Sequence, residues 1–320
     1  MHHYCTLFDR NYLTRGLALH RSLRRHAREF TLHVLCLDAA TEEALATLAL
    51  PSVELVSLEA LQDWDPDLRA VRGGRSLPEF YFTCKPFLLG YLLERAPRLE
   101  RLSYLDSDLY FFADTACVER ECAGSPIALT PHRFSAKNAG RKKYGNFNAG
   151  WLSVDGGVEA RRFVEWWRNR CHEWCRTVVE EMRFGDQKYL DQVPALFPGT
   201  RIVSHPGMNL GPWNILPGSV AQAAGGVTVS GQRLVFFHFH GIRRLYLDYY
   251  DCGLFEYGVA LTPEIRNGIY RPYLAELSDC AHQASTLAPT DAAAGGALGF
   301  ARQLRETLRA VVRRSALRAG

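Results

Sequence analysis

Short apolar runs alternate with helical patterns along the first third of the chain. The runs at 3–8, 30–37 and 53–58 are typical of strands that are buried inside a sheet. Between the first two, residues 13–25 place leucines four apart and end in arginines, which is typical of an amphipathic helix. Thr41 is expected to cap a second helix. This alternation predicts an α/β fold with a mostly parallel sheet and helices on both faces.

The pattern continues into the middle of the chain. A helix is expected from Thr83 to about Arg95, with Pro86 in its first turn. A strand then ends at Asp106, a further strand covers 147–154, and a helix covers 157–175. The residues from Asp186 to Gln192 are expected to open a short helix.

An aromatic run at 234–239 completes the set of expected strands. Alternation along a strand puts every second side chain on the same face, so His238 is expected to share a face with His240. These two imidazoles are therefore candidates for a common site.

The strand that ends at Asp106 leads directly into Asp106-Ser107-Asp108. Open α/β sheets bind ligands at the carboxyl ends of their strands. Two carboxylates separated by one residue repel each other unless a cation lies between them. Such oxygen ligands suit Mg²⁺ or Mn²⁺, and an ion held there would typically bind a diphosphate.

Composition places the chain among globular proteins. It has 320 residues, of which 47% are hydrophobic and 22% are charged. The longest apolar runs, such as 86–93, are too short to cross a bilayer, and the first residues do not resemble a signal peptide. Nine cysteines without a regular spacing favour free thiols. We therefore expect a cytoplasmic protein, with the inner face of the membrane as an alternative place of action.

Charge is unevenly distributed. The formal net charge is +4, but residues 300–320 carry six arginines and one acidic residue, so the remainder is nearly neutral. Phe300, Leu304, Leu308 and Val311 recur at helical spacing, which predicts a basic amphipathic helix. This helix could contact an anionic membrane or pack on its own domain. The nearly neutral body offers no basic groove for nucleic acid.

The predicted organisation has three parts. Residues 1–275 form the α/β domain, 276–299 form a linker of low complexity, and 300–320 form the basic helix.

Five further motifs accompany the acidic pair, and their order along the chain is informative. They are Thr6-Leu7-Phe8-Asp9-Arg10-Asn11, Thr83-Cys84-Lys85-Pro86, Asn146-Phe147-Asn148-Ala149-Gly150, Gly185-Asp186-Gln187 and His238-Phe239-His240-Gly241-Ile242-Arg243-Arg244. With the acidic pair, they resemble the motifs of nucleotide-sugar glycosyltransferases of the GT-A fold. The nearest resemblance is to the retaining family (family 8-like) that includes glycogenin and bacterial lipopolysaccharide galactosyltransferases, and it covers about Tyr4 to Tyr246.

The resemblance implies a role for each matched residue on the donor side. The first motif would hold the uridine of a UDP-sugar, through Leu7, Asp9 and Asn11. Lys85 would lie near the donor phosphate, where arginine is commoner in the family.

The acidic motif and the last motif would share the metal and the diphosphate. Asp106 would bind the metal and the ribose beside Ser107, and Asp108 would give the closer metal contact. The remaining residues implied for this part of the site are His238 as a third metal ligand, His240 as its alternative, Gly241, and Arg244 as a diphosphate clamp. The family usually has lysine followed by Pro-Trp at the clamp, whereas Arg244 is followed here by Leu245-Tyr246.

The same resemblance implies the chemistry. Asn148 and Asp186 would orient the donor sugar, and Gln187 would support an oxocarbenium-like state. The expected reaction moves a sugar from a UDP-sugar, with Mn²⁺ or Mg²⁺, to a hydroxyl of a glycan or glycolipid acceptor, with retention. Trp166, Trp167, Trp174, Trp213 and Tyr246 could stack on sugar rings or belong to the core.

Two other functions remain open from the sequence. One is a sugar-nucleotide or glycan binding protein without turnover. The other is a metal-dependent phosphatase of the haloacid dehalogenase type, whose motif is also a strand followed by Asp-x-Asp. That family needs Thr or Val two residues after the second aspartate, where this chain has Tyr110.

Overall fold

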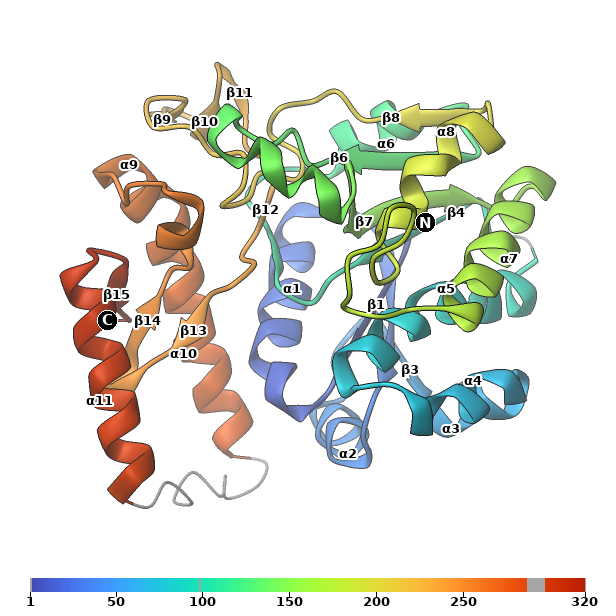
Figure 1. Ribbon diagram of the computed structural model, residues 1–320, viewed down its shortest axis with the longest axis horizontal. Coiled ribbons are helices and arrows are strands. Elements are labelled where there is room, and N and C mark those ends of the chain that lie inside the picture. Colours follow the sequence, from blue (N-terminus) through green and yellow to red (C-terminus); the bar gives the residue numbers. More distant parts are fainter. Residues whose placement is uncertain (1, 98, 287–296, 320) are drawn as a thin grey trace.

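A seven-stranded sheet forms the centre of the computed structural model, which describes residues 2–97, 99–286 and 297–319 (Figure 1). The strand order is β3-β2-β1-β4-β7-β6-β8. The strands are β1 (His2–Phe8), β2 (Phe30–Cys36), β3 (Val53–Ser57), β4 (Arg101–Leu105), β6 (Ile127–Pro131), β7 (Phe147–Asp155) and β8 (Thr200–Ile202). All neighbours are parallel except that β7 is antiparallel to β4 and β6. The predicted α/β class with a mostly parallel sheet is confirmed.

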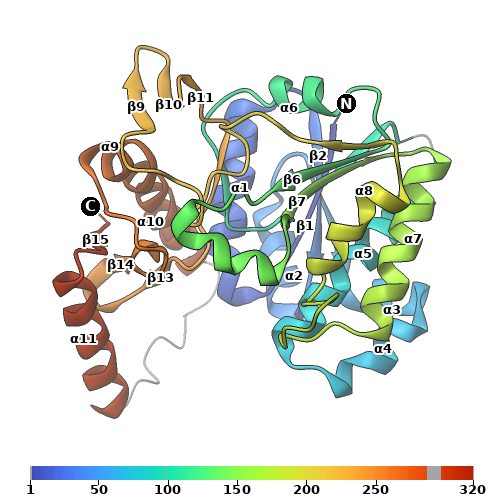
Figure 2. The same cartoon turned by 45° about the horizontal axis from the view of Figure 1, so that its top comes forward.

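Helices cover both faces of this sheet (Figure 2). They are α1 (Leu13–His26), α2 (Ala39–Leu48), α3 (Leu58–Trp64), α4 (Pro66–Val71), α5 (Leu77–Arg95), α6 (Ala116–Cys122), α7 (Val158–Glu173) and α8 (Val193–Leu196). Along β1, Tyr4 and Phe8 are buried in the cluster that contains α1, and Cys5 and Leu7 are buried in the cluster that contains α5 and α7. The strand runs are apolar throughout because each strand is buried on two sides.

Two helix starts differ from those expected. Asp38, rather than Thr41, caps α2, because its carboxylate accepts a hydrogen bond from the Thr41 backbone N–H at 2.7 Å. Helix α5 begins at Leu77, where Ser76 and Glu79 form a capping box, and not at Thr83. Pro86 therefore lies inside the helix instead of in its first turn. The reciprocal bonds of the capping box satisfy the orphan N–H groups earlier in the chain than Thr83 could.

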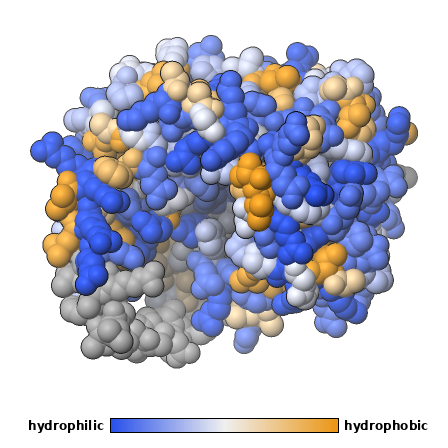
Figure 3. Space-filling view, viewed as in Figure 1, coloured by the Kyte–Doolittle hydropathy of each residue, from blue (hydrophilic) through white to orange (hydrophobic). Residues whose placement is uncertain are grey.

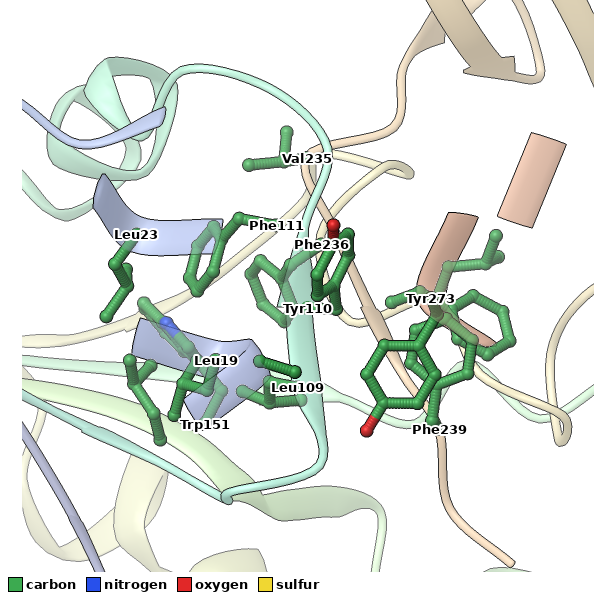
Figure 4. Close-up of a cluster of buried hydrophobic side chains, with 14 of the residues drawn as sticks. Leu19, Leu23, Leu109, Tyr110, Phe111, Trp151, Val235, Phe236, Phe239 and Tyr273 are labelled. Atoms are coloured by element: carbon green, nitrogen blue, oxygen red, sulfur yellow. The ribbon is translucent and has the colours of Figure 1, made fainter. Parts of the chain in front are cut away.

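A small antiparallel pair joins the middle of the chain to its later part. β5 (Leu109–Phe111) pairs with β12 (Phe236–His238), so the aromatic strand is shorter than the expected 234–239. Figure 4 shows the buried cluster around this pair, with rings from both strands beside side chains of α1. Next to it, the rings of Phe239 and Tyr273 stack with centroids 3.7 Å apart. This core fixes the segment that carries His238 and His240.

The last part of the chain packs against α1. α10 (Arg271–Ser285) lies beside α1, and its buried Glu276 forms ion pairs with Arg21 and Arg25 (Figure 1). The expected linker at 276–299 therefore begins too early, because the start of that segment is helical and packed. Residues 287–296 lie outside the described residues.

The expected terminal helix is also shorter than 300–320. α11 (Ala297–Val312) is followed by β15 (Ala316–Arg318), which pairs with β14 (Tyr249–Asp251). The side chains of Phe300 and Leu304 lie outside the described part. Among the described residues, no helix has the length and apolar character needed to span a membrane.

Further elements follow β8 in the later part of the chain. They are β9 (Val220–Ala223), β10 (Gly226–Val229), β11 (Gln232–Arg233), β13 (Arg243–Arg244) and α9 (Pro263–Ile265). Residues of β9, β10 and the loops before β12 extend the same buried cluster toward the last part of the chain.

Candidate active site

The acidic pair lies in the turn between β4 and β5. The backbone N–H of Asp106 donates to the carbonyl of Gly150 on β7 at 2.8 Å, and that of Leu109 donates to the carbonyl of Asp106 at 3.1 Å. Asp106 and Asp108 are partly exposed, while Ser107 between them is buried. Backbone bonds to a central strand thus fix the turn at the carboxyl end of β4.

The pairing of β5 with β12 brings His238 to this turn. His238 lies opposite Leu109 in the ladder, and its Nε2 is 3.0 Å from Oδ1 of Asp108. Burial opposes the ionisation of Asp108, but the neighbouring His238 ring outweighs it and holds the pKa of this carboxyl well below its usual range. Burial in turn lowers the pKa of His238, and the Asp108 carboxylate outweighs this and raises it.

His240 completes a cluster with these two residues. Asp108, His238 and His240 each offer one ligand atom, and these atoms lie within 4.8 Å of one another. Nδ1 of His238 is buried and has no hydrogen-bond partner among the described residues. One carboxylate and two imidazoles form a donor set that suits a divalent first-row cation. The residues present therefore fit a metal ion, and the two histidines that were alternatives in the sequence lie together.

Asp106 lies beside this cluster and is held by an ion pair and a hydrogen bond. Its Oδ1 forms an ion pair with Nζ of Lys85 at 3.0 Å and accepts a hydrogen bond from the Tyr104 hydroxyl at 2.8 Å. Its Oδ2 is 3.8 Å from Nε2 of His238. One oxygen of Asp106 is thus held by the protein, and the other faces the histidine cluster.

Lys85 on α5 is buried between two carboxylates. Its Nζ lies 3.0 Å from Asp106 and 3.3 Å from Oδ2 of Asp186. Burial lowers the pKa of Lys85, but these two carboxylates outweigh it and raise the pKa well above its usual range. Burial raises the pKa of Asp186, and the charge of Lys85 offsets part of that change. Lys85 therefore stays charged and ties the metal turn to Asp186.

Gln187 and Asn148 both have fixed amide groups. Nε2 of Gln187 donates to the carbonyl of Tyr144 at 3.0 Å, and its Oε1 accepts from the N–H of Ala149 at 3.3 Å. Oδ1 of Asn148 accepts from the N–H of Gly150 at 2.7 Å. Both amides are locked by the backbone of β7 and of the segment before it.

A pocket of about 480 Å³ brings the candidate residues together. Those on its wall are Lys85, Asp106, Asn148, Gly150, Asp186, Gln187, His238 and His240. Trp213 also lines the pocket, with its ring centroid 5.3 Å from that of His238, whereas Trp167 belongs to the buried core. The pocket therefore brings together candidates from five of the six motifs.

His132 is a pocket residue that the sequence analysis did not identify. It follows β6, and its ring stacks on Phe134 with centroids 4.5 Å apart. Its Nε2 lies 3.1 Å from Nδ2 of Asn148. Burial, followed by the charge of His238, lowers the pKa of His132 to about 3, so the ring is neutral. The available signal was a histidine directly after an apolar strand.

The candidate uridine residues lie at the end of β1. Oδ1 of Asp9 accepts from the backbone N–H of Asn11 at 3.0 Å, and its Oδ2 accepts from the Asn11 side chain and the Tyr81 hydroxyl, each at 3.2 Å. Leu7 is buried in the core. Asp9 thus stabilises the loop in which it lies.

Arg244 lies away from the metal cluster. It is exposed on β13, is paired with Asp248, and lines a separate cavity of about 940 Å³ together with Asn11. Gly241 follows His240 with a φ of +80°, which turns the chain toward β13. The structure therefore groups Arg244 with the candidate uridine loop and not with Lys85.

No family model matches the chain. Two proteins of Bacillus subtilis (strain 168) match it by sequence. The uncharacterized protein YfnF is 30% identical over 75% of this chain and 81% of its own length. The uncharacterized protein YfnD is 31% identical over 75% of this chain and 77% of its own length.

Solved structures give the fold. A crystal structure of an active-site mutant of LgtC matches with a TM-score of 0.50 and 16% identity, over 75% of this chain and 87% of that chain. A second structure, of the galactosyltransferase LgtC with donor and acceptor sugar analogs, matches with a TM-score of 0.49 and 14% identity, over 90% of this chain and 98% of that chain. At 16% identity, the likeness to the first of these structures concerns the fold, which is the expected GT-A fold. The chain thus has the GT-A fold and belongs to the family of B. subtilis YfnF and YfnD.

Proposed function

We propose that the protein is a glycosyltransferase that uses a divalent cation, Mn²⁺ or Mg²⁺, and a UDP-sugar donor. The observation that carries this proposal is the single pocket in which Lys85, Asp186 and Asn148 lie beside the cluster of Asp108 and His238. LgtC, which has a similar fold, is a galactosyltransferase that binds donor and acceptor sugar analogs. The carboxylates, the buried lysine and the fixed amides on the pocket wall suit a charged, hydroxyl-rich ligand such as a sugar diphosphate.

The proposed reaction is a group transfer. The bond between the anomeric carbon and the diphosphate oxygen breaks, and its electron pair leaves with the diphosphate. A bond forms between the same carbon and an acceptor hydroxyl, whose proton passes to solvent or to the departing phosphate. We propose retention of configuration, in line with the family that the motifs resemble.

Each side chain of the pocket would have a separate role in the reaction. A bound cation would neutralise the charge that develops on the leaving diphosphate. Asn148 and Asp186 would hold hydroxyls of the donor sugar. The fixed amide of Gln187 would place its dipole near the anomeric carbon. Lys85 would act as a positioning residue, because it is buried between Asp106 and Asp186.

The uridine would bind at the end of β1, near Asp9 and Asn11. Arg244 shares a cavity with Asn11, and its exposed guanidinium would reach the diphosphate from that side. A guanidinium can bind two phosphate oxygens at once, which suits this role.

We also propose a cytoplasmic enzyme that works at the inner membrane surface on a glycan or glycolipid acceptor. Its nine cysteines are all free thiols, which fits a reducing compartment. On α11, Leu308, Val311 and Val312 are 58%, 49% and 81% exposed. Exposed arginines such as Arg305 and Arg309 lie on the same helix, and hydrophobic and hydrophilic atoms lie side by side over it in Figure 3. This combination suits an anionic bilayer.

Release of UDP from a panel of nucleotide sugars tests the enzymatic proposal. Purified protein with Mn²⁺ should release UDP from at least one donor, and a chelator should stop the release. Asp108→Asn should remove the activity, whereas Asp63→Asn, in an exposed ion pair, should not. Donor binding without any release would favour a binding protein instead. A phosphoenzyme trapped on Asp106 would favour the phosphatase.

Cosedimentation with anionic phospholipid vesicles tests the membrane contact. The variant Leu308→Asp/Val312→Asp should lose vesicle binding, because both residues are exposed on α11. Val158→Asp/Leu196→Asp is the matched control, since these residues are equally exposed elsewhere. Equal vesicle binding by both variants would contradict the proposed membrane contact.

A further inference from the structure

A second cavity, of about 850 Å³, adjoins the candidate active site. One wall is the 3-10 helix Ala136–Tyr144, and the other is the segment 255–260, with Arg313 directly after α11. We refer to this cavity as the basic groove. Its charged lining residues are Lys137, Arg141, Lys143 and Arg313 against a single acid, Glu256.

The cations of the basic groove are held by neutral groups. Nζ of Lys137 donates to the carbonyl of Gly258 at 3.3 Å, and Arg141 donates to the carbonyl of Glu256 at 3.1 Å. The Arg141 guanidinium also lies 4.1 Å from the centroid of the Tyr257 ring. Within the described part of the chain, neither Lys137 nor Arg141 forms an ion pair with a carboxylate.

Two further cations lie over aromatic rings. Nζ of Lys143 is 5.1 Å from the centroid of the Tyr144 ring, and the Arg313 guanidinium is 4.5 Å from that of Phe255. Contacts with rings and carbonyls orient a cation without neutralising it. The basic groove therefore keeps a concentrated positive charge in a chain whose body is otherwise nearly neutral.

The basic groove is continuous with the pocket. Arg141, Tyr144 and Tyr257 line both cavities. The carbonyl of Tyr144 accepts the hydrogen bond from Gln187 that fixes its amide. A molecule in the basic groove would thus reach toward Gln187 from the side of Tyr144, whereas Asp108 lies in the turn before β5.

We infer that the basic groove is the acceptor subsite, and that the natural acceptor carries an anionic group, a phosphate or a carboxylate. The anion would lie among Lys137, Lys143 and Arg313, with the attacking hydroxyl directed into the pocket. This inference rests on the proposed function and adds the chemical class of the acceptor. Charge complementarity in a partly enclosed groove favours an anionic ligand over a neutral sugar.

The test compares three acceptors: a methyl hexoside, the corresponding hexose 6-phosphate and the hexuronic acid. The full-length protein should show a KM about tenfold lower for at least one of the anionic acceptors than for the neutral one. That preference should shrink as salt is added. The phosphate and uronate arms tell which anion is preferred. Equal KM values for all three acceptors would overturn the inference.

A charge-reversal variant assigns the effect to the groove. Lys137→Glu/Lys143→Glu should raise the KM for the anionic acceptor about tenfold, and should leave donor hydrolysis and the KM for the neutral acceptor unchanged. Lys142→Glu is the matched control, because Lys142 lies on the same 3-10 helix but does not line the groove. Equal losses in Lys142→Glu and in the double variant would refute the assignment.

A direct binding measurement tests this inference independently of the proposed function. Calorimetry with hexose 6-phosphate needs no turnover, so it can be read even if no donor is found. Binding that is lost in Lys137→Glu/Lys143→Glu and kept in Lys142→Glu would support the anion subsite on its own. Competition by UDP for that binding would instead assign the groove to the donor diphosphate and overturn the acceptor role.

Discussion

Gly150 lies directly against His238, so that a β-carbon at position 150 would be 2.4 Å from Cε1 of the imidazole. The same β-carbon would be 2.6 Å from Oδ1 of Asn148 and 2.8 Å from Oδ2 of Asp106. Three candidate site residues thus meet around one glycine of β7. The absence of a side chain there is what allows them to share a pocket.

Gly150→Ala is expected to displace His238 and to weaken Mn²⁺ binding at least about tenfold, since ligand positions tolerate little movement. Calorimetric titration with Mn²⁺ measures the effect. Gly73→Ala is the control, because a β-carbon at Gly73 would meet nothing within 4 Å. Unchanged Mn²⁺ affinity in Gly150→Ala would contradict the proposed place of the ion.

Asp108→Ala is expected to abolish metal-dependent UDP binding and to leave the circular dichroism spectrum unchanged. His238→Ala should weaken Mn²⁺ binding more than His240→Ala, because His238 is buried and lies 3.0 Å from Asp108, whereas His240 is exposed. Calorimetry on the three variants gives the order. The reverse order for the histidines would make His240 the principal ligand.

Lys85→Met is expected to destabilise the fold by about 3–5 kcal/mol, because it leaves the carboxylates of Asp106 and Asp186 without their buried cation. Urea unfolding measures this loss. Lys142→Met is the control, since Lys142 is exposed. Equal stability of the two variants would show that Lys85 does not neutralise these carboxylates.

Glu79 predicts a pH dependence of stability. Burial raises its pKa, but hydrogen bonds from Thr177 and Ser76 outweigh burial and lower the pKa to about 2. The usual value of 4.5 applies to the unfolded chain, so this stabilisation is fully present above about pH 4.5 and is lost as the pH falls toward 2. Glu79→Gln should cost about 1–3 kcal/mol at pH 7.

The loss in Glu79→Gln should shrink between pH 4.5 and pH 2, because the wild-type carboxylate then becomes neutral as well. Unfolding free energies of both proteins across this range provide the measurement. A difference that is constant over the whole range would contradict the assigned cause. Thr177 lines the pocket, so Glu79 also ties that wall to α5.

Tyr273→Ala is expected to cost about 3–5 kcal/mol by removing the ring that stacks on Phe239. It should also weaken Mn²⁺ binding, because Phe239 lies between the two histidines in sequence. Tyr273→Phe is the matched control, since the Tyr273 hydroxyl has no hydrogen-bond partner among the described residues. An equal loss of stability in both variants would point to the hydroxyl instead of the ring.

Local patterns predicted five of the seven strands of the central sheet, and β6 and β8 were not predicted. The strands β1, β2, β4 and β7 lie where apolar runs predicted them, because a strand buried on both faces is apolar throughout. The predicted start of α5 at Thr83 was wrong, although Ser76 and Glu79 carry the capping-box pattern that marks the observed start. Thr83 and Pro86 offered a competing helix start, and only the long-range packing of the earlier turns decides between the two.

The candidate site was likewise predicted only in part from the sequence. Alternation predicted that His238 and His240 lie together, but the contact of His238 with Asp108 depends on the pairing of β12 with β5, which no local pattern encodes. His132 was missed because β6 was not recognised as a strand. Arg244 was grouped with Lys85 by resemblance, whereas the fold places it beside Asn11.

The contact between Asp108 and His238 joins two widely separated parts of the chain, so an ion held there would bind the native state and not the unfolded one. At a free concentration one hundred times its dissociation constant, it would add about 2.7 kcal/mol to the stability of the protein. The thermal stability of the protein would therefore rise with the free concentration of the cation. In a cell that is short of it, the protein would be degraded faster as well as working more slowly.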